Sequence, residues 1–345
     1  MWTTGVAARW FANVYGWEWR WLLPASAVLE LAAFLIFFRA VSRHRPDSPT
    51  KRSFEPWLWV VMSASIGLMS VLAVNLGATI YLALYGTTPA VSHVLDQRCL
   101  VLTTWGFLVP FVWGFSIKWM PVFLGLKPVR PGLLFAALVA DFAGIVLTFA
   151  GLENPATVLF VAAVALAIAG LRMFEPAQHE PKTRGVHCSF PYFVRMAYGW
   201  LVVAALLGVG ATLWDSSGGI WGASRHALTV GFIAIMVLCV GQRVLPAFAG
   251  MRLLWSTRLM FAALALLTIG CALRVSGEVL AYQGYANWAW SVLPVSAVLE
   301  LAGVTAFGVN IAATFILEPS HIQRQPLVIG IGQALGASHR ADRGS

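Results

Sequence analysis

Long apolar runs alternate with short polar segments along almost the whole chain. Nine of these runs approach or exceed about 20 residues, the length that a helix needs to cross a hydrocarbon core of roughly 30 Å. The pattern therefore predicts an all-α fold, a polytopic transmembrane helical bundle with about nine spans. The predicted spans cover residues 21–41, 57–85, 99–117, 132–151, 155–173, 192–214, 227–249, 258–277 and 288–317.

The two chain ends lie outside this pattern. Residues 1–20 place Trp2, Val6, Trp10, Val14 and Trp17 at helical spacing, which predicts an amphipathic helix in the membrane interface, where indole rings prefer to lie. This segment has no basic head before an apolar run, so it is not expected to be a cleavable signal. Residues 318–345 are polar and close with GASHRADRGS, which predicts a cytoplasmic tail.

The apolar runs contain internal repeats. PASAVLELA at 24–32 recurs as PVSAVLELA at 294–302, and residues 104–127 align without gaps on residues 229–252. These offsets predict a four-helix unit that repeats without changing its orientation. The predicted division is a first unit at 21–151, a second unit at 155–277 and a ninth helix at 288–317 that begins a third copy.

Composition supports a membrane protein. Of the 345 residues, 59% are hydrophobic and 11% are charged, and the mean hydropathy is +0.77. The charged fraction is less than half of the roughly 25% that is usual in globular domains. The lipid bilayer is therefore an expected partner. The four cysteines form no CxxC pair, so neither a disulfide framework nor a thiolate metal site is indicated.

The net charge of +9 comes mainly from the loops on one side of the predicted bundle. Of the 23 lysines and arginines, the other side keeps five: Arg9, Arg20, Arg98, Arg225 and Arg274. The positive-inside rule then places the amino terminus outside and the carboxyl terminus in the cytoplasm. Cytoplasmic loops account for the charge, so no nucleic-acid partner is expected.

Three acidic residues lie near the middle of predicted spans: Glu30, Glu300 and Asp141. A carboxylate there costs roughly 2.5–3.5 kcal/mol, so these side chains are expected to face the bundle interior. No lysine or arginine is expected at matching depth, and the acids should be mostly protonated at neutral pH. The middle copy has Val161 at the position of Glu30 and Glu300. Each acid is either a proton relay or the donor of an interhelical hydrogen bond.

His93 and His226 precede the third and seventh predicted spans on the outer side. Imidazole is an axial ligand for haem iron and a good copper ligand, so both are candidate cofactor ligands, with His226 the candidate metal ligand. The alternative for His226 is a polar helix start at the interface. Arg225 and Arg98 could receive an anionic group such as a haem propionate, or could anchor their helices at the interface.

The stretch HALTVG at 226–231, followed by QRV at 242–244, resembles the signature of the NnrS family. The repeated four-helix unit is more distantly similar to subunit I of the haem–copper oxidases. The NnrS resemblance implies a protein of a bacterial inner (cytoplasmic) membrane that binds haem, with copper as a second candidate cofactor. It also implies a role in nitric-oxide response or electron transfer, with a redox partner or membrane complex. Val101 and Leu102 stand where the family pattern has a His-Glu pair.

A cofactor-free function is the alternative that the sequence leaves open. The chain would then be a proton-linked or small-solute transporter, or a membrane subunit of a larger complex, that uses the buried acids. A full oxidase is not expected, because its binuclear centre needs several inward-facing histidines within the membrane. The predicted spans supply histidines at their outer ends alone.

Overall fold

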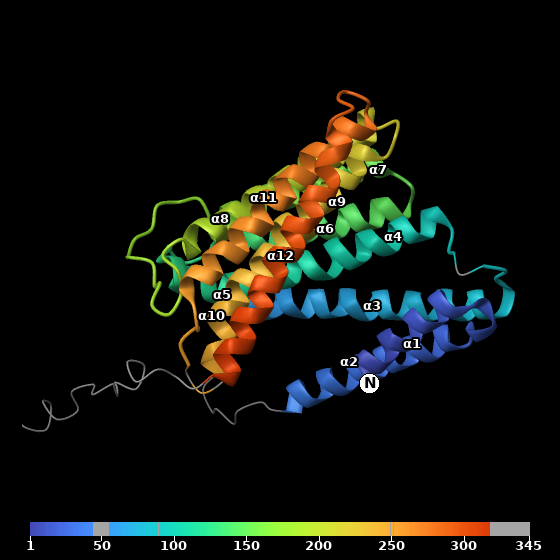
Figure 1. The fold of residues 1–345 in the computed structure, drawn as a ribbon, viewed down its shortest axis with the longest axis horizontal. Coiled ribbons are helices and arrows are strands. Elements are labelled where there is room, and N and C mark those ends of the chain that lie inside the picture. Colours follow the sequence, from blue (N-terminus) through green and yellow to red (C-terminus); the bar gives the residue numbers. More distant parts are fainter. Residues whose placement is uncertain (44–54, 89, 249, 251, 318–345) are drawn as a thin grey trace, which may run out of the picture.

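The structure is a computed structural model that describes residues 1–43, 55–88, 90–248, 250 and 252–317, and these residues form helices and no strand (Figure 1). The α-helices are α1 (Trp2–Tyr15), α2 (Leu22–Arg43), α3 (Pro56–Tyr85), α4 (His93–Thr103), α5 (Val109–Leu124), α6 (Pro131–Phe149), α7 (Glu153–Leu171), α8 (Phe190–Trp214), α9 (Gly219–His226), α10 (Ile235–Phe248), α11 (Thr257–Tyr282) and α12 (Ala289–Ile316). The predicted tail at 318–345 lies outside the described residues.

Nine helical segments of the described residues are long and apolar enough to cross a membrane, which confirms the predicted number. Two of them are composite. A π-helical segment, η2 (Thr104–Leu108), joins α4 to α5, and a second one, η3 (Ala227–Ala234), joins α9 to α10. The chain is therefore an all-α, multi-pass membrane protein.

Local sequence explains where several helices begin and end. Proline occupies the first turn of α3, α6 and α8, where its missing N–H is not needed. The Ser92 side chain accepts a hydrogen bond from the Leu95 backbone N–H and so starts α4 at His93. At the other end of this span, α5 ends at Gly125 with φ 67°. A side chain there would also collide with the backbone of His179.

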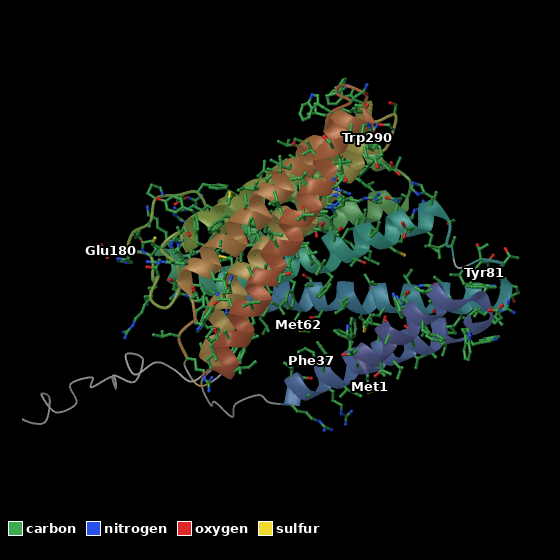
Figure 2. The ribbon with its side chains drawn as sticks, in the orientation of Figure 1. Met1, Phe37, Met62, Tyr81, Glu180 and Trp290 are labelled. Atoms are coloured by element: carbon green, nitrogen blue, oxygen red, sulfur yellow. The ribbon has the colours of Figure 1, made fainter. Side chains whose placement is uncertain are left out.

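The packed core lies between the middle helices of the chain. Its largest fully buried side chains include Trp113, Tyr198, Phe190 and Phe232, which come from α5, α8 and η3. The helices α2, α3 and α12 bury less of their surface and lie at the edges of the bundle (Figure 1). Apolar side chains such as Phe37 of α2 project outward from these edges (Figure 2), as expected of surfaces that face lipid.

The two π-helical segments fall at positions that the sequence repeat aligns. Gly106 of η2 and Gly231 of η3 correspond in the alignment, and each approaches the preceding long helix closely. A Cβ on Gly67 of α3 would lie 1.9 Å from the Gly106 carbonyl oxygen, and a Cβ on Gly231 would lie 2.6 Å from Cγ of Trp200 in α8. Single-turn π segments occur frequently at functional sites.

The amino-terminal helix packs along α2. Gly5 of α1 lies against Ser26 and Glu30, because a Cβ there would meet the Ser26 carbonyl oxygen at 3.0 Å and Glu30 Cγ at 3.1 Å. The exposed face of α1 carries Trp2 and Trp10. The helix over 1–20 is thus joined to the first span, while its depth in the membrane interface stays a prediction.

Candidate functional site

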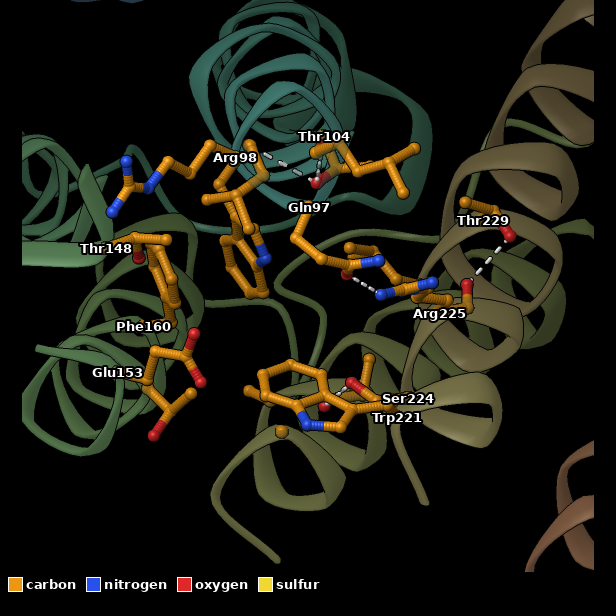
Figure 3. Close-up of a pocket in the computed structure, with 18 of the residues that line it drawn as sticks. Gln97, Arg98, Thr104, Thr148, Glu153, Phe160, Trp221, Ser224, Arg225 and Thr229 are labelled. Atoms are coloured by element: carbon orange, nitrogen blue, oxygen red, sulfur yellow. Dashed lines mark hydrogen bonds between the residues drawn. The ribbon is translucent and has the colours of Figure 1, made fainter. Parts of the chain in front are cut away.

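A cavity of about 380 Å³ opens between the two predicted four-helix units, at their predicted outer end (Figure 3). Residues of α4, η2, α6, α7, α8, α9 and η3 line it. Three of the four predicted cofactor-binding residues, His93, Arg98 and Arg225, belong to this lining. The fourth, His226, does not.

Two guanidinium groups reach the cavity from opposite units. Arg225 on α9 donates a hydrogen bond through Nη2 to Oε1 of Gln97 on α4, across the cavity (Figure 3). Arg98 makes no hydrogen bond or ion pair within the described part of the chain, and its side chain extends toward Thr148 (Figure 3). Glu153 is the acidic residue of the lining. Arg98 is therefore the donor that is most available to a ligand.

The remaining walls are largely aromatic and apolar. The rings of Trp105 and Phe160 stack with centroids 4.5 Å apart and an interplanar angle of 13°, and Trp221 lines the cavity as well. The hydroxyls of Thr104 and Thr229 donate to carbonyl oxygens of their own helices, at 2.8 and 2.7 Å. The two arginines thus share the cavity with a largely apolar wall.

His226 lies in a separate polar cluster between α9 and α11. Its Nδ1 is 3.1 Å from Oε2 of Glu278 and 3.2 Å from the Gly222 carbonyl oxygen. The other carboxylate oxygen of Glu278 accepts a hydrogen bond of 2.9 Å from Nε of Arg274. Glu278 is 5% exposed. Sequence reasoning did not identify Glu278, although its spacing of four residues from Arg274 was a signal.

Glu30 has a basic partner, so the expectation that no lysine or arginine lies at its depth is wrong. Nη2 of Arg9 lies 2.8 Å from Glu30 Oε2, and Nε of Arg9 lies 3.2 Å from Oγ of Ser26. Nη1 of Arg9 donates to Asn75 Oδ1 on α3. The expectation failed because α1 folds back along α2 and carries Arg9 to the glutamate.

The contact between α1 and α2 is repeated between α11 and α12. A Cβ on Gly270 would meet Glu300 Cγ at 2.7 Å and the Ser296 carbonyl oxygen at 3.1 Å, as one on Gly5 would meet the equivalent atoms of α2. The α1 helix therefore corresponds to the second half of α11. The two glycines begin the segments GVAAR at 5–9 and GCALR at 270–274.

The middle copy of this contact corrects the predicted register by one residue. Gly144 of α6 lies against α7, where a Cβ would meet Cε1 of Phe160 at 2.7 Å and the Ala156 carbonyl oxygen at 3.2 Å. Phe160 therefore takes the place of Glu30 and Glu300, which the sequence had assigned to Val161. The aromatic ring removes the acid from the middle copy and forms part of the cavity wall.

Two buried carboxyl oxygens have no hydrogen-bond partner within the described residues, Oδ1 of Asp141 and Oε1 of Glu300. Asp141 is 3% exposed in α6. Leaving such an oxygen without a donor is costly unless the carboxyl is neutral. The structure does not bring Asp141, Glu30 and Glu300 together as one chain of polar groups by any hydrogen bond among the described residues.

The loop before α9 is held by Asp215. Burial acts to raise the pKa of this carboxyl, yet the backbone N–H groups of Trp221, Ser217 and Gly218 and the Gln283 amide hold that pKa below its usual value. The shortest of these bonds are 2.7 Å from Gln283 and 2.8 Å from Trp221. Asp215 thereby fixes α9, which carries both Arg225 and His226.

Residues 61–310 match the family described as Domain of unknown function (DUF8744). No curated protein matches the chain. The matched segment contains the whole cavity lining and the cluster around His226. Glu30 and Arg9 lie before it.

Proposed function

This chain belongs to the DUF8744 family, and we propose that it binds an amphipathic organic anion in the cavity, as a multi-pass protein of a bacterial inner membrane. The observation that carries the proposal is the meeting of two guanidinium groups, Arg98 and Arg225, with the stacked pair Trp105 and Phe160. Guanidinium groups bind carboxylates and phosphates through paired hydrogen bonds, and flat aromatic walls favour flat apolar ligands.

Haem is the ligand that the NnrS resemblance implies, and the cavity offers partners for its propionates and its macrocycle. Its two propionates would match Arg98 and Arg225, and its macrocycle would contact the apolar wall that includes Trp105 and Phe160. When bound, haem would supply an iron that takes nitric oxide or an electron. His93 is the one imidazole of the cavity lining.

The expected ligand role of His226 does not fit this cavity. His226 is absent from the lining, and its Nδ1 faces Glu278 instead. His93 is therefore the residue that would hold the iron of a haem in the cavity. A single imidazole is also a sparse donor set for copper, which favours several nitrogen or sulfur ligands.

The test is a titration of the detergent-purified protein with haemin and with metal-free protoporphyrin, followed by absorption and by quenching of tryptophan fluorescence. Arg98→Gln and Arg225→Gln should each weaken both ligands about 10-fold, since a charge-assisted hydrogen bond contributes roughly 1.5 kcal/mol. Arg20→Gln is the matched control, because it removes an arginine that is also predicted to lie outside but does not line the cavity.

The histidines separate the two parts of the proposal. His93→Ala should change the haem spectrum and leave protoporphyrin binding intact, whereas His226→Ala should change neither. Equal affinities in the wild type, the two cavity variants and the control would refute the anion site. If the haem spectrum changes with His226→Ala alone, haem binds on the face of α9 that carries His226 and not in the cavity.

Transport or a subunit role is the second candidate, and Asp141 is the observation that favours it. This carboxyl is almost fully buried within an apolar helix and has a partnerless oxygen in the described structure. Intramembrane acids of this kind frequently mark proton or solute pathways. Proton uptake on addition of the organic anion, lost in Asp141→Asn, would favour a proton-linked transporter.

A further inference from the structure

The arginine of the repeated helix pair has a different partner in its two copies. Arg9 crosses from α1 to Glu30 of α2, at 2.8 Å. Arg274 has the same position against α12, because its helix makes the same glycine contact with Glu300. Yet Arg274 donates within its own helix, to Glu278 at 2.9 Å. Glu300 is left with a buried oxygen that has no partner among the described residues.

The residue four positions after each arginine accounts for this difference. That residue is Asn13 after Arg9 and Glu278 after Arg274. A carboxylate one helical turn away competes for a guanidinium, whereas a neutral amide competes weakly. In the first copy no carboxylate competes, and the arginine pairs with the glutamate of the next helix. By analogy, Arg274 can pair with Glu300 when Glu278 does not compete.

The charges of the second copy require a bound proton. Arg274 offers one positive charge to two carboxyl groups, Glu278 and Glu300, within an apolar bundle. His226 contributes a hydrogen bond to Glu278, at 3.1 Å. Two carboxylates beside one guanidinium would leave a net negative charge in a medium where an unpaired charge is expensive. The cluster becomes neutral when it binds one proton, held either by one of the two carboxyl groups or by the imidazole of His226.

We propose that α9, α11 and α12 form a proton-binding site in which Arg274 exchanges between Glu278 and Glu300 as one proton passes between them. In the state described here, Glu300 holds the proton, Glu278 is ionised and pairs with Arg274, and Nδ1–H of His226 donates to Glu278. In the other state, Glu278 holds the proton on Oε1, its Oε2 still accepts a hydrogen bond from Nδ1–H of His226, and Arg274 pairs with ionised Glu300. Charge and hydrogen count are the same in both states.

Two further titratable residues, Arg225 and Cys271, lie next to this site and are not part of it. Arg225 precedes His226 on α9, but its side chain lines the cavity and donates to Gln97. Cys271 on α11 is buried, and its Sγ donates to the His226 carbonyl oxygen at 3.8 Å. The site lies outside the lining of the anion cavity, so it stands or falls separately from the proposed function.

The decisive variant is Glu278→Asn, which gives the second copy the residue of the first. Infrared difference spectroscopy of the purified protein between acidic and alkaline pH reads the C=O stretch of protonated carboxyl groups. Glu300→Gln should remove one such band. Glu278→Asn should remove the same band although Glu300 is intact, because Arg274 then pairs with Glu300 and ionises it. Glu30→Gln is the matched control and should leave the band unchanged.

Asn13→Glu is the reverse variant, and it changes an exposed side chain. It places a competing carboxylate beside Arg9, so a new protonated-carboxyl band should appear. Asp141→Asn identifies any band that belongs to the other buried acid. The proposal is overturned if Glu300→Gln removes no band, or if Glu278→Asn leaves the Glu300 band in place. Unchanged gel-filtration elution and circular dichroism ensure that each variant is compared in the folded state.

Discussion

Nη2 of Arg9 lies 2.8 Å from Oε2 of Glu30, so an ion pair joins the amino-terminal helix to the first span. Ser26 and Asn75 complete the arrangement by accepting further hydrogen bonds from the same guanidinium. Three helices, α1, α2 and α3, thereby meet at one arginine. This explains how an acidic residue is accommodated within an apolar segment at the edge of the bundle.

Removing one partner of this ion pair should destabilise the protein more than removing both. Arg9→Ala leaves Glu30 without its counter-charge and should lower the free energy of unfolding by about 2 kcal/mol, between the values for exposed and buried pairs. Adding Glu30→Gln to Arg9→Ala should recover part of the loss. Thermal unfolding in detergent of the two single variants and the double variant measures the coupling. Strictly additive losses would show that the pair contributes nothing.

A methyl group on Gly67 should disrupt the contact between α3 and η2. Its Cβ would lie 1.9 Å from the Gly106 carbonyl oxygen, and a backbone atom cannot move aside. Gly67→Ala should therefore cost about 2–3 kcal/mol. Gly77→Ala in the same helix is the control, since no atom lies within 4 Å of its Cβ position. Equal thermal stability of the two variants would contradict the close approach of α3 to the π segment.

The loop before α9 should lose stability in acid. The carboxyl pKa of Asp215 is held below its usual value by hydrogen bonds from backbone N–H groups and Gln283, so its stabilising effect is present above the unfolded pKa of about 3.9. That effect disappears as the pH falls through the lower pKa of the folded state. Asp215→Asn should cost about 1 kcal/mol at pH 6, and its melting temperature should converge with that of the wild type near pH 3. A difference that persists at pH 3 would assign the effect to packing.

The exposed thiol of Cys188 tests the predicted orientation. It lies in the segment between α7 and α8, beside Lys182 and Arg184, which the positive-inside rule places in the cytoplasm. A membrane-impermeant maleimide should label Cys188 in inside-out vesicles and not in right-side-out vesicles. Cys239 and Cys271 are buried and serve as unreactive internal controls. Labelling from the outside alone would invert the topology.

The nine spans could be predicted because each is predominantly apolar over about 20 residues, and a bilayer accepts few other structures. The division of one span into α4, η2 and α5 could not be predicted. A π segment differs from an α-helix by a shift in backbone hydrogen bonds, and the apolar pattern of residues 99–117 contains no sign of it.

Side-chain partners were harder to predict than helices. Arg9 was treated as part of an interfacial segment, so its reach to Glu30 was missed, although the echo of GVAAR in GCALR was present in the sequence. His93, Arg98 and Arg225 were chosen as cofactor-binding candidates at the predicted outer end, and the structure places all three in the lining of one cavity, while their binding role stays a prediction. His226 was grouped with them as an imidazole at the outer end of a span and as part of the NnrS-like stretch. It follows Arg225 directly on α9, so its side chain points in a different direction and contacts Glu278.

The two π segments also determine which changes in length the chain can tolerate. Each residue of an α-helix turns its successor by about 100°. A π segment holds one residue more than the α-helical turn it replaces, so deleting one residue within η3 would restore α-helical hydrogen bonds. Deleting one residue from the regular turns of α10 would instead rotate α9, which moves Arg225 away from the cavity and His226 away from Glu278. The span would keep its length and hydropathy. A single-codon deletion at 227–234 would thus be tolerated, whereas the same deletion in α10 would dismantle both polar sites at once.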